Sequence, residues 1–211
     1  MTATATQPAS EERSEPKKSS VIVRHQAWWW AAEDGAPPPV PGFVHSAFNP
    51  LVAAVADRCL SEHYGKPPEP PSDRQRTGLV LVSRGGDRVS AEHVRQTVAD
   101  GRRVGPLYFF QSVPNSIAGH VAARWGLGGP VVCVSPVGPP VADGMAEAAV
   151  LMSDGDADEV LLVIAEQATA ADDSAVDCAH ALLLGWPAEH APTNDQAATG
   201  ESAMAGEGRT V

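Results

Sequence analysis

The chain has 211 residues, of which 43% are hydrophobic, and its formal net charge is −11. This length fits one domain with a sizeable core, and the acidic balance argues against a nucleic-acid partner, because the phosphate backbone requires clustered Lys and Arg. No stretch approaches the ~18 consecutive apolar residues of a membrane span. The three cysteines are too widely spaced for a zinc site, and we expect no metal and no cofactor.

Both ends of the chain differ in composition from its middle. Residues 1–18 and 189–211 are polar, small and rich in Ala, Ser, Thr and Glu, a composition typical of disordered segments. The sequence therefore predicts one folded domain over residues 19–188. The polar N-terminus contains no apolar signal-peptide core, so we expect a cytoplasmic protein.

The first part of the domain predicts a strand, a loop and a helix. Residues 20–23 (S-V-I-V) read as a short first strand, and the three tryptophans at 28–30 with the proline-rich residues 36–42 read as an irregular loop. Residues 50–63 place apolar side chains at helical spacing after the cap and first-turn proline of Asn49-Pro50. Four prolines in residues 66–72 end this helix.

The rest of the domain alternates between strands and helices. Residues 78–83 (G-L-V-L-V-S) have the uninterrupted apolar character of a central parallel strand. A helix beginning at Ser90 is predicted over 90–99, although its capping box is incomplete. The remaining patterns predict helices over 114–125 and 141–152 and strands over 131–134, 160–165 and 179–184. This alternation predicts an α/β fold with a mostly parallel sheet.

Residues 104–166 carry a family resemblance. They contain P-N-S-I-A-G at 114–119, G-L-G-G-P at 126–130 and G-D-A-D-E-V-L at 155–161, separated by a strand and a helix-like run. This order resembles the N-terminal half of the β-ketoacyl synthases of the thiolase superfamily. The resemblance implies one thiolase-like half, a five-stranded, mostly parallel sheet in the order 3-2-1-4-5 with flanking helices. The second half, with the family's catalytic histidines and lysine, has no counterpart in these residues.

In that family a cysteine between the strand and the following helix is the nucleophile, and here the matching position is Gly138. Glycine has no side chain to acylate, and Pro139 and Pro140 remove two amide donors from the turn. The resemblance therefore implies that no catalytic residue remains at this place and that the chain has no independent activity.

Other residues are weaker candidates for a nucleophile or a base. Cys133 lies inside the strand and is interpreted as a small core residue, and Ser135 has no surrounding G-x-S-x-G elbow. His120 on the 114–125 helix is interpreted as a packing or interface histidine, and His180 begins the last strand. These residues keep open the alternative of a small thioesterase or acyltransferase that uses Cys133 or Ser135.

The resemblance also implies a partner. In the family, the strand matching Val131, Val132, Cys133 and Val134 lies at a sheet edge and pairs with a second subunit, and Asn115 and His120 would lie near the interface. An exposed V-V-C-V edge without Lys or Pro requires a cover. We expect a second copy or a full-length ketosynthase there, with acyl carrier protein as a further partner.

Three functions are compatible with these residues. The first is a non-catalytic ketosynthase-like subunit in polyketide, aryl-polyene or fatty-acid type biosynthesis, and the second is the small acyl-transferring or thioester-hydrolysing enzyme. The third is a homodimeric module that binds acyl chains.

Overall fold

The computed structural model describes residues 21–67, 76–168 and 176–187. The predicted disordered segments, 1–18 and 189–211, and most of the proline-rich segment 66–72 lie outside the described residues. The elements follow in chain order: β1 (Ile22–Trp30), α1 (Ala31–Asp34), α2 (Phe48–Tyr64), β2 (Thr77–Val82), α3 (Arg88–Ala99), α4 (Pro106–Ser112), α5 (Pro114–Trp125), β3 (Val131–Val134), α6 (Pro140–Ser153), β4 (Glu159–Glu166) and β5 (Cys178–Gly185).

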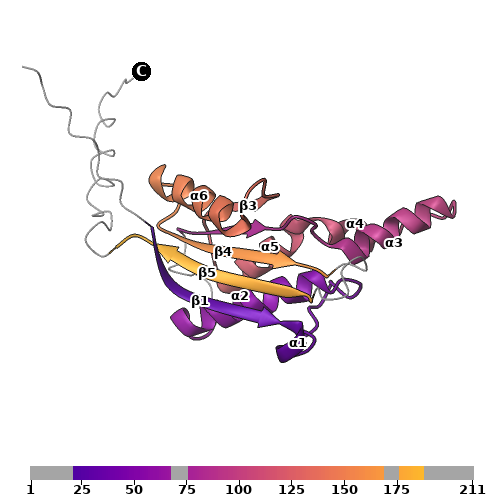
Figure 1. Cartoon of the computed structure of the whole chain (residues 1–211), viewed down its shortest axis with the longest axis horizontal. Helices are drawn as coiled ribbons and strands as arrows, with labels where there is room; N and C mark the ends of the chain where they lie inside the picture. Colours follow the sequence, from indigo (N-terminus) through magenta and orange to yellow (C-terminus); the bar gives the residue numbers. More distant parts are fainter. Residues whose placement is uncertain (1–20, 68–75, 169–175, 188–211) are drawn as a thin grey trace, which may run out of the picture.

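One five-stranded sheet organises the described chain, in the order β1-β5-β4-β2-β3 (Figure 1). The pairs β4–β2 and β2–β3 are parallel, whereas β1–β5 and β5–β4 are antiparallel. The sheet is therefore mixed, and the prediction of a mostly parallel sheet in the order 3-2-1-4-5 is wrong. The prediction that Val131–Val134 forms an edge strand is confirmed.

The edge position of β1 is one difference between the predicted and the observed strand orders. The predicted strand at 20–23 is in fact nine residues long and includes all three tryptophans, which the sequence pattern assigns to a loop. Its polar segment Arg24-His25-Gln26 suits an edge strand, because a central strand needs apolar residues on both faces. The aromatic residues that follow are strong strand formers, and they extend the strand along β5.

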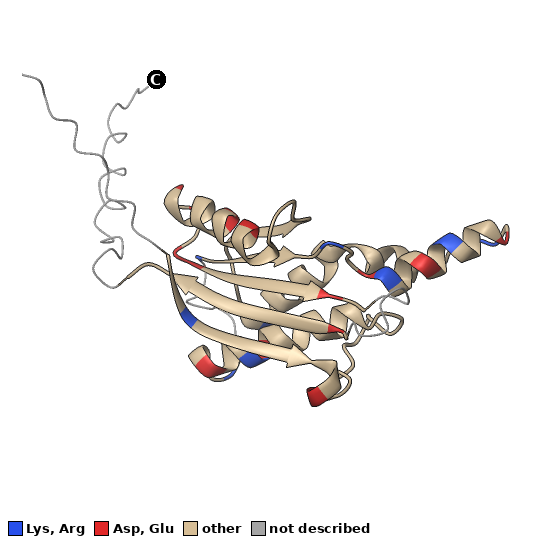
Figure 2. Ribbon diagram, in the orientation of Figure 1, with Lys and Arg blue, Asp and Glu red and all other residues tan. Residues whose placement is uncertain are grey.

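Helices cover the two faces of the sheet unequally. α2 and α5 pack on one face, where Leu79, Leu81 and Leu161 are buried. On the other face α6 packs against β2 and β4, over Val80 and Leu162. Figure 2 shows that charged residues lie on helices and at strand ends, while the middle of β4 and β5 is uncharged. The side chains of β4 and β5 contribute to the hydrophobic clusters on both faces of the sheet.

Two helical predictions need correction. α3 begins at Arg88 because Asp87, not Ser90, caps it, and the Asp87 carboxylate accepts hydrogen bonds from the Ser90 amide and hydroxyl. The apolar pattern does not predict the helix α4, although Gly105-Pro106 places a proline at its first position. α3 and α4 extend away from the sheet (Figure 1).

The close approach of α6 to the sheet depends on Gly144. A Cβ atom there would lie 2.5 Å from Leu162 Cδ1 and 3.0 Å from Val82 Cγ2. We predict that Gly144→Ala lowers the free energy of unfolding by about 1–3 kcal/mol through overpacking, as measured by urea denaturation. Gly119→Ala in α5 is the control, because a Cβ there meets nothing within 4 Å. Equal stability of the two variants would contradict this account of the packing.

Candidate functional site

The candidate site lies where β3 ends and α6 begins. Residues 135–139 connect the strand to the helix, and Gly138 lies in this connection, two residues before the first residue of α6. The helix has Pro139 as its N-cap and Pro140 as its first residue, and neither has an amide hydrogen to donate. The amides of the connection just before this helix are those of Val137 and Gly138.

A carboxylate of the helix itself takes both of these amides. Oδ2 of Asp143, in the first turn of α6, accepts hydrogen bonds of 2.8 Å from the Val137 amide and 2.8 Å from the Gly138 amide. The positive end of the helix dipole favours an anion at this place. A Cβ atom at Gly138 would lie 3.1 Å from Asp143 Oδ1. The position that resembles that of the nucleophile is thus next to a fixed negative charge.

A second set of contacts fixes the connection from the other side. Nη2 of Arg84 donates to the Gly138 carbonyl at 2.6 Å, and the Arg84 amide donates to Oε1 of Glu166 at 2.7 Å. Arg84 directly follows Ser83 after the end of β2, and Glu166 is the last residue of β4. The carboxyl ends of two parallel strands and the start of α6 are therefore joined around Gly138.

This arrangement opposes thioester chemistry. A cysteine nucleophile needs a lowered thiol pKa, and an acyl intermediate needs free donors for its oxyanion. Here the carboxylate of Asp143 supplies a like charge and accepts hydrogen bonds from the amides of Val137 and Gly138. These hydrogen bonds hold the connection in place.

Cys133 lies in β3 and Ser135 begins this connection, but both lack a base. Burial raises the pKa of the Cys133 thiol to about 11, so the thiol is protonated at neutral pH. Ser135 is exposed, and no hydrogen bond joins it to another part of the described chain. Burial also raises the pKa of Cys59 to about 12 and raises that of Cys178.

The histidines do not supply the missing base. His120 is half-buried on α5, with its ring edge against Phe43 at a centroid distance of 5.7 Å. His180 is on β5, separated from β3 by two strands, which is roughly 14 Å at about 4.8 Å per strand. It is buried, stacks on Trp28 at 3.4 Å, and its pKa is lowered by burial. The structure thus does not bring His180 to Cys133 or Ser135.

The predicted interface residues lie on β3 and α5. Val131 is 37% exposed at the sheet edge, and Asn115 is exposed in the first turn of α5. The carbonyls of Pro130 and Val134 accept hydrogen bonds from the amides of Leu79 and Ser83, in and just after β2. Because carbonyl and amide directions alternate along a strand, the backbone groups of Val131 and Cys133 point outward. They are available to an added strand.

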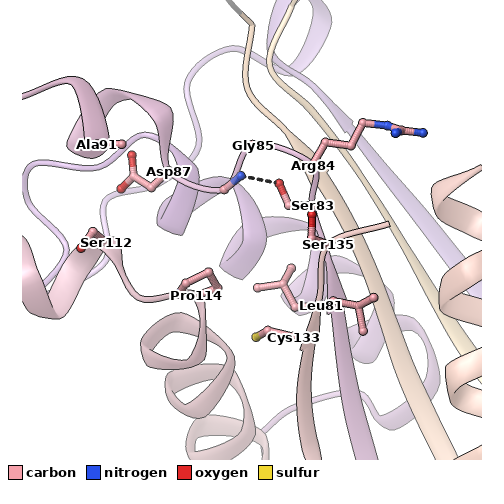
Figure 3. Close-up of a pocket in the computed structure, with 12 residues that line it drawn as sticks. Leu81, Ser83, Arg84, Gly85, Asp87, Ala91, Ser112, Pro114, Cys133 and Ser135 are labelled. Carbon is pink, nitrogen blue, oxygen red and sulfur yellow. Dashed lines mark hydrogen bonds between the residues drawn. The ribbon is translucent and has the colours of Figure 1, made fainter. Parts of the chain in front are cut away.

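A cavity of about 380 Å³ opens beside this edge, at the carboxyl ends of β2 and β3 (Figure 3). It lies between the starts of α3 and α5, which contribute Asp87, Ala91 and Pro114 to its wall. Figure 3 shows Leu81 and Cys133 at one end of the cavity and Ser83 and Ser135 together at another. The cavity combines apolar walls with hydroxyl groups, a composition that ligand sites commonly have.

Sequence reasoning misses two residues of the site. The sequence patterns do not single out Asp143, although an acidic residue in the first helical turn is itself a signal of interaction with the helix start. No sequence pattern indicates a role for Arg84, because its contact with Gly138 joins residues 54 positions apart.

Neither a metal centre nor a membrane span forms in the described ranges. In residues 21–67, 76–168 and 176–187, no three His, Cys, Asp or Glu side chains come together as a metal site would require. Over the same residues, no helix is long and apolar enough to cross a membrane.

Comparison with known structures identifies the class of fold. The chain matches a structure from Xenorhabdus doucetiae, "Ketosynthase (ApeO) in Complex with its Chain Length Factor (ApeC)", with a TM-score of 0.61 and 20% identity over 81% of this chain and 80% of the other. It matches "The ishigamide ketosynthase/chain length factor" with a TM-score of 0.62 and 19% identity, over 82% of this chain and 63% of the other. It matches a β-ketoacyl synthase from Burkholderia phymatum with a TM-score of 0.57 and 16% identity, over 82% of this chain and 60% of the other. The chain is thus a thiolase-like α/β protein, and it spans less than two thirds of the last two matched chains.

The sequence defines the family more closely. The family model for "Beta-ketoacyl synthase, N-terminal domain" matches residues 69–207, about two thirds of the chain. The chain belongs to this family. No curated protein matches the chain.

A cysteine introduced at Gly138 tests the account of the closed site. Gly138 does not have a positive φ, so its backbone accepts a side chain. We predict that the thiol of Gly138→Cys reacts slowly with iodoacetamide at pH 7, because the nearby Asp143 carboxylate disfavours the thiolate. Adding Asp143→Ala frees the two amides, and reaction becomes about tenfold faster as the helix start lowers the thiol pKa. Peptide mass spectrometry measures each cysteine separately, and equal rates in the two variants would refute the account.

The native thiol at Cys133 gives a pH-dependent prediction. Its pKa near 11 means that the reactive thiolate forms only as the pH rises toward that value. Alkylation of Cys133 in the unmodified protein should therefore be slow at pH 7 and accelerate about tenfold for each pH unit up to about pH 10. A rate that levels off near neutral pH would show that the thiol is activated.

Proposed function

We propose that this chain is a non-catalytic ketosynthase-like subunit. It acts with a complete ketosynthase, and with acyl carrier protein, in polyketide, aryl-polyene or fatty-acid type biosynthesis. The observation that carries the proposal is the double hydrogen bond of Asp143 to the amides of Val137 and Gly138. A carboxylate beside Gly138 disfavours an oxyanion at this place, so we expect the chain to contribute shape and contact.

The structural matches support the choice of partner. One matched structure is a complex of a ketosynthase with its chain length factor, and the match covers nearly equal shares of both chains, 81% and 80%. The matched chain therefore has about the length of this one. A subunit of similar size and fold in such a complex favours an auxiliary role for this chain.

The open edge of β3 supports a direct mode of association. Its outward backbone groups and the partly exposed Val131 suit pairing with a strand of another subunit. The cavity of about 380 Å³ lies at the end of this same strand, and Cys133, Val134 and Ser135 line it. In the proposed complex, the cavity contributes to the pocket for an acyl chain delivered by the carrier protein.

The proposed alternative of a small thioesterase or acyltransferase has less support. It requires a reactive Cys133 or Ser135, yet burial keeps the Cys133 pKa at about 11, and no histidine in the described residues hydrogen-bonds to either. A homodimeric acyl-binding module would use the same β3 edge with a second copy. The non-catalytic subunit and the homodimeric module therefore differ in the chain that pairs with β3: a complete ketosynthase in the first, a second copy in the other.

Purification from the native host tests the partner. We predict that the tagged chain co-purifies with a full-length β-ketoacyl synthase in equal amounts, identified by mass spectrometry. Val131→Pro should abolish this, because it removes an outward amide at the sheet edge. Val131→Thr keeps the amide and serves as the control. Light scattering that shows a homodimer and no captured synthase would favour the acyl-binding module, and covalent acylation of the isolated chain would refute the proposal.

A further inference from the structure

His180 on β5 is a buried histidine whose two ring nitrogens have no hydrogen-bond partner. Its side chain is 9% exposed, and neither Nδ1 nor Nε2 meets a donor or an acceptor among the described residues. Most buried polar side chains are hydrogen-bonded, so a ring with two unpaired nitrogens requires an explanation. The connection around Gly138 does not supply one, because His180 is separated from β3 by two strands.

The side chain of Trp28 stacks on this ring from the neighbouring strand. Trp28 and His180 are opposite each other in the register of β1 and β5, and their rings are 7° from parallel with a centroid distance of 3.4 Å. The indole is 45% exposed and belongs to neither hydrophobic cluster of the sheet. Because β1 is an edge strand, the indole can move into solvent without opening either cluster.

The charged groups on the elements around the stack do not pair with the His180 ring. These groups are the carboxylates of Glu33 and Asp34 on α1, Glu166 on β4, Asp177 just before β5, and Asp143 and Glu147 on α6. Glu166 and Asp177 accept hydrogen bonds from backbone amides instead. Cys178, two residues before His180 on β5, has a thiol pKa that burial raises. Burial lowers the pKa of His180, and no neighbouring charge opposes this shift.

Protonation makes the stacked arrangement unfavourable. A neutral imidazole has one N–H donor, whereas an imidazolium has two and carries a charge. Stacking on the face of an indole favours the charged ring, but a buried charge without hydrogen bonds is disfavoured more strongly. Movement of the exposed indole lets water reach the ring nitrogens and removes this cost.

We propose that His180 and Trp28 form an acid-sensitive contact: when His180 is protonated, Trp28 moves away from β5 into solvent, and the end of the edge strand β1 loosens. Because burial lowers the pKa of His180 in the closed form, the stacked arrangement is fully favoured above the ordinary histidine pKa of about 6.5. Its stability then decreases as the pH falls through the lowered pKa. The residue pairs affected are Trp28 with His180 and Trp30 with Cys178. The contact does not depend on the proposed function, because it lies away from β3.

A pH titration of the full chain labelled with 5-fluorotryptophan tests the proposal. Trp28→Phe identifies the fluorine NMR signal of Trp28, and the Cε1 proton of His180 reports the protonation of the ring. We expect the two signals to change together between about pH 8 and pH 5, with one midpoint below about 6.5. Trp28→Ala should move the His180 midpoint up toward the ordinary value, because water then reaches the ring.

Two histidine variants separate this contact from a general effect of pH. His180→Gln keeps a polar side chain that does not titrate, and it should make the Trp28 signal independent of pH. His93→Gln is the matched control, because His93 also stacks on an aromatic ring, that of Tyr108 at 4.0 Å, but is exposed. This control should leave the change in the Trp28 signal intact.

Three outcomes would overturn the proposal: a His180 midpoint at or above about 6.5, a Trp28 signal that does not follow it, or an equal loss of the change in His93→Gln. The first two are measured on the chain without substitutions at the stack, so they decide the question even if His180→Gln fails to fold.

Discussion

The carboxylate of Asp143 is the group on which the candidate site depends. It accepts hydrogen bonds from the amides of Val137 and Gly138, just before α6. Arg84 donates to the Gly138 carbonyl, and the Arg84 amide donates to the Glu166 carboxylate. Charge-assisted hydrogen bonds are roughly twice as strong as neutral ones, so the group that stabilises this connection also keeps its donors occupied. The same amide cannot donate fully to a fixed carboxylate and to a developing oxyanion. The contacts that stabilise the connection therefore also occupy the amides of Val137 and Gly138.

The two edges of the sheet differ in how well they suit the addition of another strand. β1 contains a bulge between Val23 and His25 and the polar residues Arg24 and Gln26, features that discourage the addition of another strand. β3 has only four residues, all apolar or weakly polar, and contains no such feature. The strands between the edges are buried on both faces along β2 and through the middle of β4. The sheet thus has one protected edge and one edge suited to pairing.

Local patterns predict most of the elements, but not the way in which they assemble. Helix α5 and strand β3 have the predicted bounds, because their apolar spacing, proline and glycine signals all agree. The predicted sheet order is wrong because it rests on the family resemblance, whereas Arg24-His25-Gln26 already indicates an edge strand. The motif spacing singles out Gly138 but not its contacts with Asp143 and Arg84. Strand and helix patterns do not show which side chain hydrogen-bonds to the backbone amides before a helix. Contacts between distant residues, such as Arg84 and Gly138, leave no periodic trace in a sequence.

The cavity and the connection before α6 share residues at the end of β3, because Ser135 and Arg84 both line the cavity while Arg84 also donates to the Gly138 carbonyl. The side chain of Cys133 packs toward the core under α2 and α5, on the side of the cavity, whereas Val132 and Val134 pack toward α6. A change at the start of α6 therefore reaches the cavity both through the connection 135–139 and through Arg84. The hydrogen bonds of Asp143 and Arg84 that hold this connection thus also fix part of the cavity wall beside the open edge of β3.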